Sequence, residues 1–317
     1  MESEMQADIL CLSESCGITT ILVINYPKLD PASAGGYIYQ RKAGTDERST
    51  HTLATNDTLR TLWSSPSGDV WTSSTLGRVW TTADVPWEID DAGDGLDFDV
   101  PEGKLNWRYI QLPRQERDGG VPNTQEIWGT SSDNVFVGSF SGIIYHWNGK
   151  IWSQHDWGLG GAIGRFAGTS PKNVYACGYN SSILHFDGNK WQILCDPDST
   201  LKNEIFTGIT FGKNGDPFIC SMSGRLLQGT KNVFSVVGQY RTPFIDMLKI
   251  GDRLLFAATD HGVLELRDGK LETLRQDIIP WSMAKGDNRV YFTETPVGKT
   301  VYSEFDVTND TWRQLNF

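Results

Sequence analysis

The chain has 317 residues, 38% of them hydrophobic, and a formal net charge of −11 at pH 7. That length and hydrophobic share suffice for one large core, and the acidic balance argues against nucleic acid as the main partner, since such proteins need a basic face. No stretch approaches the roughly 18 apolar residues of a membrane span, and no leader-like segment opens the sequence, so we expect a cytoplasmic protein that makes no membrane contact.

Short strand-like runs begin near the N-terminus and fall into groups of four. Residues 7–54 form the first group, with a long connection between its second and third runs. Residues 59–112 form the second group, in which the segment 84–103 is inserted before the last run. We find no run of ten or more residues with the 3.6-residue apolar spacing of a helix.

The grouping is clearest in two copies of one unit, 127–152 and 166–191, which match at an offset of 39 residues. A period near 40 indicates a repeat architecture. Within each copy, apolar and polar residues alternate in short runs, which is typical of strands. Asn148-Gly149 and Asp187-Gly188 separate the last two runs and predict a two-residue hairpin turn. Each unit is therefore predicted to be a four-stranded antiparallel meander.

Three further units continue to the C-terminus, which makes seven units of about 45 residues each, a length typical of propeller blades. We predict an all-β protein, a seven-bladed β-propeller of four-stranded antiparallel blades in a single domain, 1–317. An open solenoid is the alternative, but it would need polar caps, and the terminal units are as apolar as the middle ones. The predicted blades are 7–54, 59–112, 124–157, 163–197, 206–239, 245–276 and 281–317.

The clearest copy opens with the pattern W-G-[TS]-S-x-x-[DN]-V-[YF], from Trp128 to Phe136, and closes with I-x-H-[WF]-[DN]-G-x-x-W, from Ile144 to Trp152. These motifs resemble the bacterial propeller repeats known as YVTN or WD-like repeats. The match is strong over 124–197 and fair over 59–82. The resemblance implies a propeller fold, and it implies no chemistry because propellers host many unrelated functions.

No catalytic constellation is recognisable in the sequence. His146 and His185 occupy equivalent repeat positions, which is typical of residues that pack within a blade. The five cysteines are odd in number and lack metal-ligand spacing, so we interpret them as reduced thiols. Propeller lactonases hold a metal with acidic residues at the centre, but most candidate acids here fall in turns that an Asp side chain stabilises. We predict no enzyme activity, no metal and no cofactor.

The inserted segment 84–103 is the largest departure from the repeat. It contains eight acidic residues and no basic one, and Trp87 and Phe98 lie among them. We predict that it docks on a basic surface of a protein partner, with the aromatic side chains as anchors; a solvated loop is the alternative. Two tryptophans in other connections complete the predicted partner-binding set, which is Trp87, Glu88, Asp90, Asp91, Asp94, Asp97, Phe98, Asp99, Trp157 and Trp281.

Three functions are compatible with these features. The first is a non-enzymatic protein-binding propeller, and the type of repeat, the acidity and the expected cytoplasmic location suggest an immunity protein that neutralises a cognate bacterial toxin. The second is a propeller hydrolase or lyase with a central metal site. The third is a glycan-binding propeller, since the stretch 69–80 is similar to tectonin-type lectin repeats.

Overall fold

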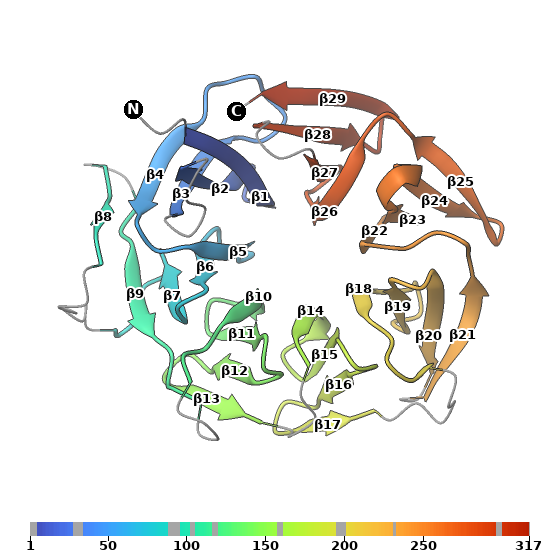
Figure 1. Cartoon of the computed structure of the whole chain (residues 1–317), viewed down its shortest axis with the longest axis horizontal. Coiled ribbons are helices and arrows are strands. Elements are labelled where there is room, and N and C mark those ends of the chain that lie inside the picture. The colour runs from blue at the N-terminus through green and yellow to red at the C-terminus, as the bar shows by residue number, and fades with distance from the viewer. Residues whose placement is uncertain are drawn as a thin grey trace.

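The structure is a computed structural model and describes residues 5–27, 34–87, 96–101, 105–115, 120–156, 161–194, 201–230, 233–295 and 300–316. Seven antiparallel sheets are arranged radially in a closed ring (Figure 1). The predicted seven-bladed β-propeller of four-stranded antiparallel blades is confirmed. A 3-10 turn, η3 (Thr259–His261), lies between the second and third strands of the sixth blade.

In every blade the strands follow one another in sequence from the ring axis to the rim. The innermost strands are β1 (Met5–Ser15), β5 (Leu59–Ser64), β10 (Thr124–Ser131), β14 (Ile163–Ser170), β18 (Phe206–Phe211), β22 (Asp246–Ile250) and β26 (Ile279–Lys285). The second strands are β2 (Ile18–Pro27), β6 (Val70–Ser74), β11 (Asn134–Ser139), β15 (Asn173–Gly178), β19 (Pro217–Ser221), β23 (Arg253–Ala257) and β27 (Arg289–Thr295). The third strands are β3 (Gly35–Lys42), β7 (Arg78–Thr81), β12 (Ile144–Trp147), β16 (Ile183–Phe186), β20 (Arg225–Thr230), β24 (Val263–Arg267) and β28 (Val301–Asp306). The outer strands are β4 (Thr50–Thr55), β9 (Arg108–Gln111), β13 (Trp152–His155), β17 (Trp191–Ile193), β21 (Val233–Gln239), β25 (Lys270–Arg275) and β29 (Thr311–Asn316).

The hydrophobic core is divided among the interfaces between neighbouring blades. Seven clusters of buried side chains are present in the described residues, and each one combines side chains from two adjacent blades. The second strand of a blade therefore lies between two neighbours, and every residue of β6 and β11 is buried. This explains why these strands carry continuous apolar or small residues, whereas the four residues of β13 at the rim are only half-buried.

In the part of the chain that the structure describes, the ring closes without an exchange of strands between its two ends. The last blade contains only β26 to β29, and the first blade begins with β1 at the axis. Side chains of the first blade, Leu12 and Ile21 among them, pack instead on Tyr291 and Leu315 of the last blade. The Tyr291 hydroxyl also bonds Thr19 at 3.1 Å and donates to the Glu14 carboxylate. Closure is thus a side-chain interface like the other six.

The rim turns only partly follow the sequence prediction. In the sixth blade, Arg267 pairs with Lys270, and Asp268 and Gly269 have φ of 48° and 76°, which is a two-residue turn with both central angles positive. In the third blade Trp147 pairs with Trp152, so the connection has four residues, and only Gly149 has a positive φ. The prediction of a two-residue turn was wrong there, because Asn148 Oδ1 accepts hydrogen bonds from the backbone amides of Lys150 and Ile151 and closes a longer loop.

Candidate interaction site

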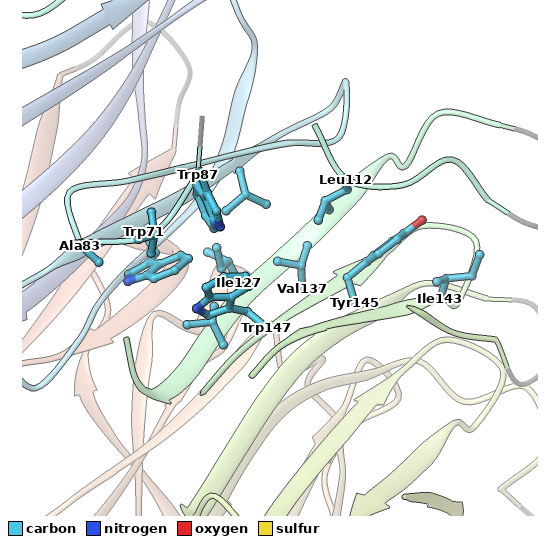
Figure 2. Close-up of a cluster of buried hydrophobic side chains, with 12 residues drawn as sticks. Trp71, Ala83, Trp87, Leu112, Ile127, Val137, Ile143, Tyr145 and Trp147 are labelled. Carbon is cyan, nitrogen blue, oxygen red and sulfur yellow. The ribbon is translucent and has the colours of Figure 1, made fainter. Parts of the chain in front are cut away.

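The insertion in the second blade starts as part of the core. Trp87 is 7% exposed and packs edge-on against Trp71 and Trp147, at ring-centroid distances of 5.7 and 5.4 Å (Figure 2). These rings lie in the cluster between the second and third blades. Trp87 was expected to be an exposed partner-binding anchor; in the structure it is a core residue, because the start of the insertion, with Val85 and Trp87, is part of that inter-blade cluster.

Several residues of the predicted set lie outside the described residues, namely Glu88, Asp90, Asp91, Asp94 and Trp157. The described end of the insertion contains Asp97, Phe98 and Asp99, all of them exposed. The three residues therefore remain candidates for partner contact.

This end of the insertion belongs to the first blade and not to its own. Strand β8 (Phe98–Asp99) pairs antiparallel with β4 and adds a fifth strand to that sheet (Figure 1). The Asn56 amide donates to the Asp97 carbonyl at 3.0 Å, and the Asp97 amide donates to Asn56 Oδ1 at 3.0 Å. The Phe98 ring turns back onto Trp80 of the second blade at 5.3 Å. The insertion thus connects two blades at the rim, which the sequence did not predict.

A pocket of about 320 Å³ lies where β8 meets the first blade. It opens at the end of that blade where β2 and β4 finish and β3 begins. Its lining residues are Asn25, Gly35, Tyr37, Ala54, Thr55, Asn56, Asp97, Phe98 and Asp99. None of them is basic, two carry carboxylates, and two carry aromatic rings.

Trp281, another residue of the predicted set, is 58% exposed. It occupies a bulge near the start of β26, between the pairs Pro280–Glu294 and Ser282–Thr293. The extra residue of a bulge turns its side chain away from the regular pleat. Ile279, two residues earlier, is 47% exposed, so the two side chains offer apolar surface at the start of an innermost strand.

A second apolar surface was not predicted from the sequence. We call it the apolar arc; it lies on the second to fifth blades and consists of Leu76, Val121, Phe140, Tyr179 and Met222, which are 39% to 55% exposed. Its members occupy the connections between second and third strands or between blades. In a meander these two kinds of connection reach the same face of the ring, because successive strands alternate in direction.

In three of these blades the same backbone hydrogen bond holds the residue that follows the second strand. The amides of Phe140, Tyr179 and Met222 donate to carbonyls at or just before the start of the innermost strand of their own blade, at 2.7, 3.0 and 3.0 Å. The rings of Phe140 and Tyr179 lie 6.4 Å apart. The signal that could have revealed the arc was present in the sequence, since these residues are equivalent in the repeat and follow a Ser or a Gly at the end of the second strand.

Charged side chains meet across the ring axis. Arg165 on β14 lies 3.3 Å from Glu126 on β10 and 3.4 Å from Asp246 on β22. Because the fourth and sixth blades are not neighbours, a contact between them has to cross the axis. Asp246 also accepts the amide of Met283 from the seventh blade. Burial raises the pKa of Glu126 to about 7 against the opposing effect of Arg165. This cluster links four blades.

The two repeated histidines pack within their blades, as the repeat suggested. Nε2 of His146 lies 2.8 Å from Asn134 Oδ1, and Nε2 of His185 lies 2.9 Å from Asn173 Oδ1. His146 also stacks on Phe136 at 4.3 Å, and its burial lowers its pKa to about 4. Within the described part of the chain no three His, Cys, Asp or Glu side chains are grouped as a metal site would require.

Among the described residues, no helix has the length and apolar content needed to cross a membrane. No family model matches the sequence, and no curated protein matches it either.

Solved structures share the fold. The C-terminal WD40 domain of Sif2 superposes with a TM-score of 0.61 at 10% identity, over 98% of this chain and 84% of that one. The WD40 propeller of Doa1 gives 0.60 at 10% identity, over 92% and 93% of the two chains. YCF48 bound to a D1 peptide gives 0.57 at 14% identity, over 83% and 82%. The chain is therefore a WD40-like seven-bladed propeller, and identities this low show the fold alone.

Proposed function

We propose that this chain is a non-enzymatic, protein-binding propeller whose contact face is the one that carries the apolar arc. The observation behind the proposal is that several exposed apolar side chains occupy equivalent positions in consecutive blades on that face. Exposed aromatic residues and Met are enriched at protein interfaces, and clustered ones mark contact sites. Loops on a rigid scaffold are common places for such contacts.

The partner is a protein with a basic surface. The net charge of −11 attracts such a partner over a distance, and Asp97 and Asp99 are exposed at the rim. The narrowest form of the proposal is an immunity protein that binds a bacterial toxin domain; it is supported by the acidity and the resemblance of the repeats. A cytoplasmic location agrees with free thiols at Cys11, Cys16, Cys177 and Cys220.

The test is capture of a partner from the native host by the intact chain, followed by affinity measurements with the purified partner. In the arc variant, Phe140, Tyr179 and Met222 are each changed to Ser. We expect its affinity to fall at least tenfold, since anchors at an interface centre cost about 2 kcal/mol or more when truncated.

The matched control changes Ile151, Ile193 and Val237 to Ser. These residues are also exposed, at 63%, 42% and 49%, but they lie on or beside outer strands. Equal loss of affinity in both variants, or no loss in the arc variant, would contradict the proposed contact face. A captured partner with an acidic surface would contradict the basic partner.

A further inference from the structure

We propose that the pocket between β8 and the first blade receives an arginine or lysine side chain from the polypeptide partner. This inference rests on the proposed function and names the chemistry of one contact within it. The pocket measures about 320 Å³ and is lined by residues from four chain segments.

One of the lining residues has an acceptor atom that lacks a hydrogen-bond donor. Oδ1 of Asn25 is buried and has no hydrogen-bond partner. A buried acceptor without a donor costs free energy, and each such group needs an explanation. Asn25 is among the residues that line the pocket, and a rotation of its side chain would bring Oδ1 to a donor that enters from outside.

The charges of the pocket favour a cation. Asp97 and Asp99 are two residues apart on an extended segment, so their carboxylates point to the same side. Their backbone is held on the first blade by the pairing with β4, which leaves the exposed carboxylates available. No basic residue is among those that line the pocket, so no cation of its own lining neutralises them.

The aromatic lining fits the stem and the flat face of such a side chain. Tyr37 and Phe98 both line the pocket. Because side chains alternate along an extended segment, the Phe98 ring lies on the opposite side of β8 from the two carboxylates, where it contacts Trp80 at 5.3 Å and Tyr109 at 5.9 Å. Tyr37 is therefore the ring that we expect to stack on the entering side chain. An arginine stacks its guanidinium on aromatic rings and donates to carboxylates with the same group, and a lysine packs its methylene stem while its ammonium donates.

The location of the pocket favours a polypeptide over a free small cation. The pocket lies at the end of the first blade where β2 and β4 finish, and Thr58 of the next connection donates to the Ala34 carbonyl there. These ends belong to the face that carries the apolar arc, because the same two kinds of connection meet there. A partner seated on the arc can therefore extend a basic side chain into the pocket.

The test uses a six-residue peptide with one arginine among glycine and serine residues, and its counterpart with neutral citrulline. Binding to the intact chain is followed by NMR shifts of the Asn25 side-chain amide. We expect millimolar binding of the arginine peptide and at least tenfold weaker binding of the citrulline peptide. The double variant Asp97→Asn, Asp99→Asn should lose the preference, whereas Asp84→Asn, which removes a fully exposed carboxylate of the same insertion, should keep it.

Three results would overturn the proposal: equal binding of both peptides, an unchanged preference in the double variant, or binding of free arginine but not of the peptide. The arc variant separates this proposal from the proposed function, because it should bind the arginine peptide as the parent does. If the pocket fails these tests while partner capture still depends on the arc, the pocket inference falls and the protein-binding function stands.

Discussion

At the scale of single residues, burial makes Trp87 a core residue and not an anchor for a partner. It packs with Trp71 and Trp147 between two blades, so Trp87→Ala should leave a cavity there. We expect a loss of about 3–5 kcal/mol in the free energy of unfolding, measured with urea. Trp281→Ala is the matched control; since Trp281 is 58% exposed, its stability should stay within about 0.5 kcal/mol of the parent. Similar losses in the two variants would refute the core assignment of Trp87.

The raised pKa of Glu126 predicts that the free energy of unfolding depends on pH. Its pKa is raised to about 7 by burial, so between its ordinary pKa and pH 7 the folded chain holds a proton that the unfolded chain has released. The contribution of Glu126 to stability is therefore full below its ordinary pKa and is lost as the pH rises to about 7. Glu126→Gln should not show this loss. As the pH rises from 4.5 to 8, the free energy of unfolding of the variant should therefore increase relative to that of the parent by about 1–3 kcal/mol.

The measurement is the free energy of unfolding in urea at several pH values. Glu272→Gln serves as the control, since the Glu272 side chain is 56% exposed and lies on an outer strand. Parallel pH profiles for the parent and Glu126→Gln would show that Glu126 does not take up a proton on folding.

At the scale of elements, β8 connects the first and second blades. Its Phe98 ring contacts Trp80 and Tyr109 of the second blade, while its backbone pairs with β4 of the first. We expect Phe98→Ala to cost about 1–2 kcal/mol of stability, in line with the loss of two aromatic contacts and part of the ring burial. Phe140→Ala is the control, because that ring is 55% exposed at a loop tip and should cost under about 0.5 kcal/mol. A Phe98 variant as stable as the control would mean that β8 adds no stability.

The pairing of β8 also covers part of the edge of β4. An uncovered edge strand offers unpaired amides and carbonyls to other chains. Deletion of 88–102 removes β8, so we expect the variant to be less stable and to self-associate at high concentration, as measured by analytical ultracentrifugation. A monomeric variant of unchanged stability would contradict this role for β8.

At the scale of the whole molecule, the ring is closed by a side-chain interface. Leu12 is 4% exposed within the cluster between the last and first blades. We expect Leu12→Ala to lower the free energy of unfolding by about 2–4 kcal/mol and to do so in one transition, because every blade is packed between two others. Tryptophan fluorescence and circular dichroism should then give the same midpoint. Separate midpoints would show that the ring opens before the blades unfold.

The architecture was accessible from the sequence because a propeller is encoded locally and repeatedly. Each meander has its own alternation of apolar and polar residues, and seven copies of it imply a closed ring. The repeat also placed His146 and His185 within their blades. That Asp97 and Phe98 belong to an insertion outside the repeat was likewise apparent.

What the sequence could not determine depended on contacts between distant segments. Whether Trp87 is exposed is decided by rings from two blades that come together only in the ring. The pairing of β8 with β4 joins residues of different repeat units, and the cluster of Glu126, Arg165 and Asp246 forms only because the blades converge on one axis. The periodicity of the chain determined the blades by itself, because strand alternation is a local property. The tertiary structure alone decided which side chains of different blades meet, because ring closure sets those distances.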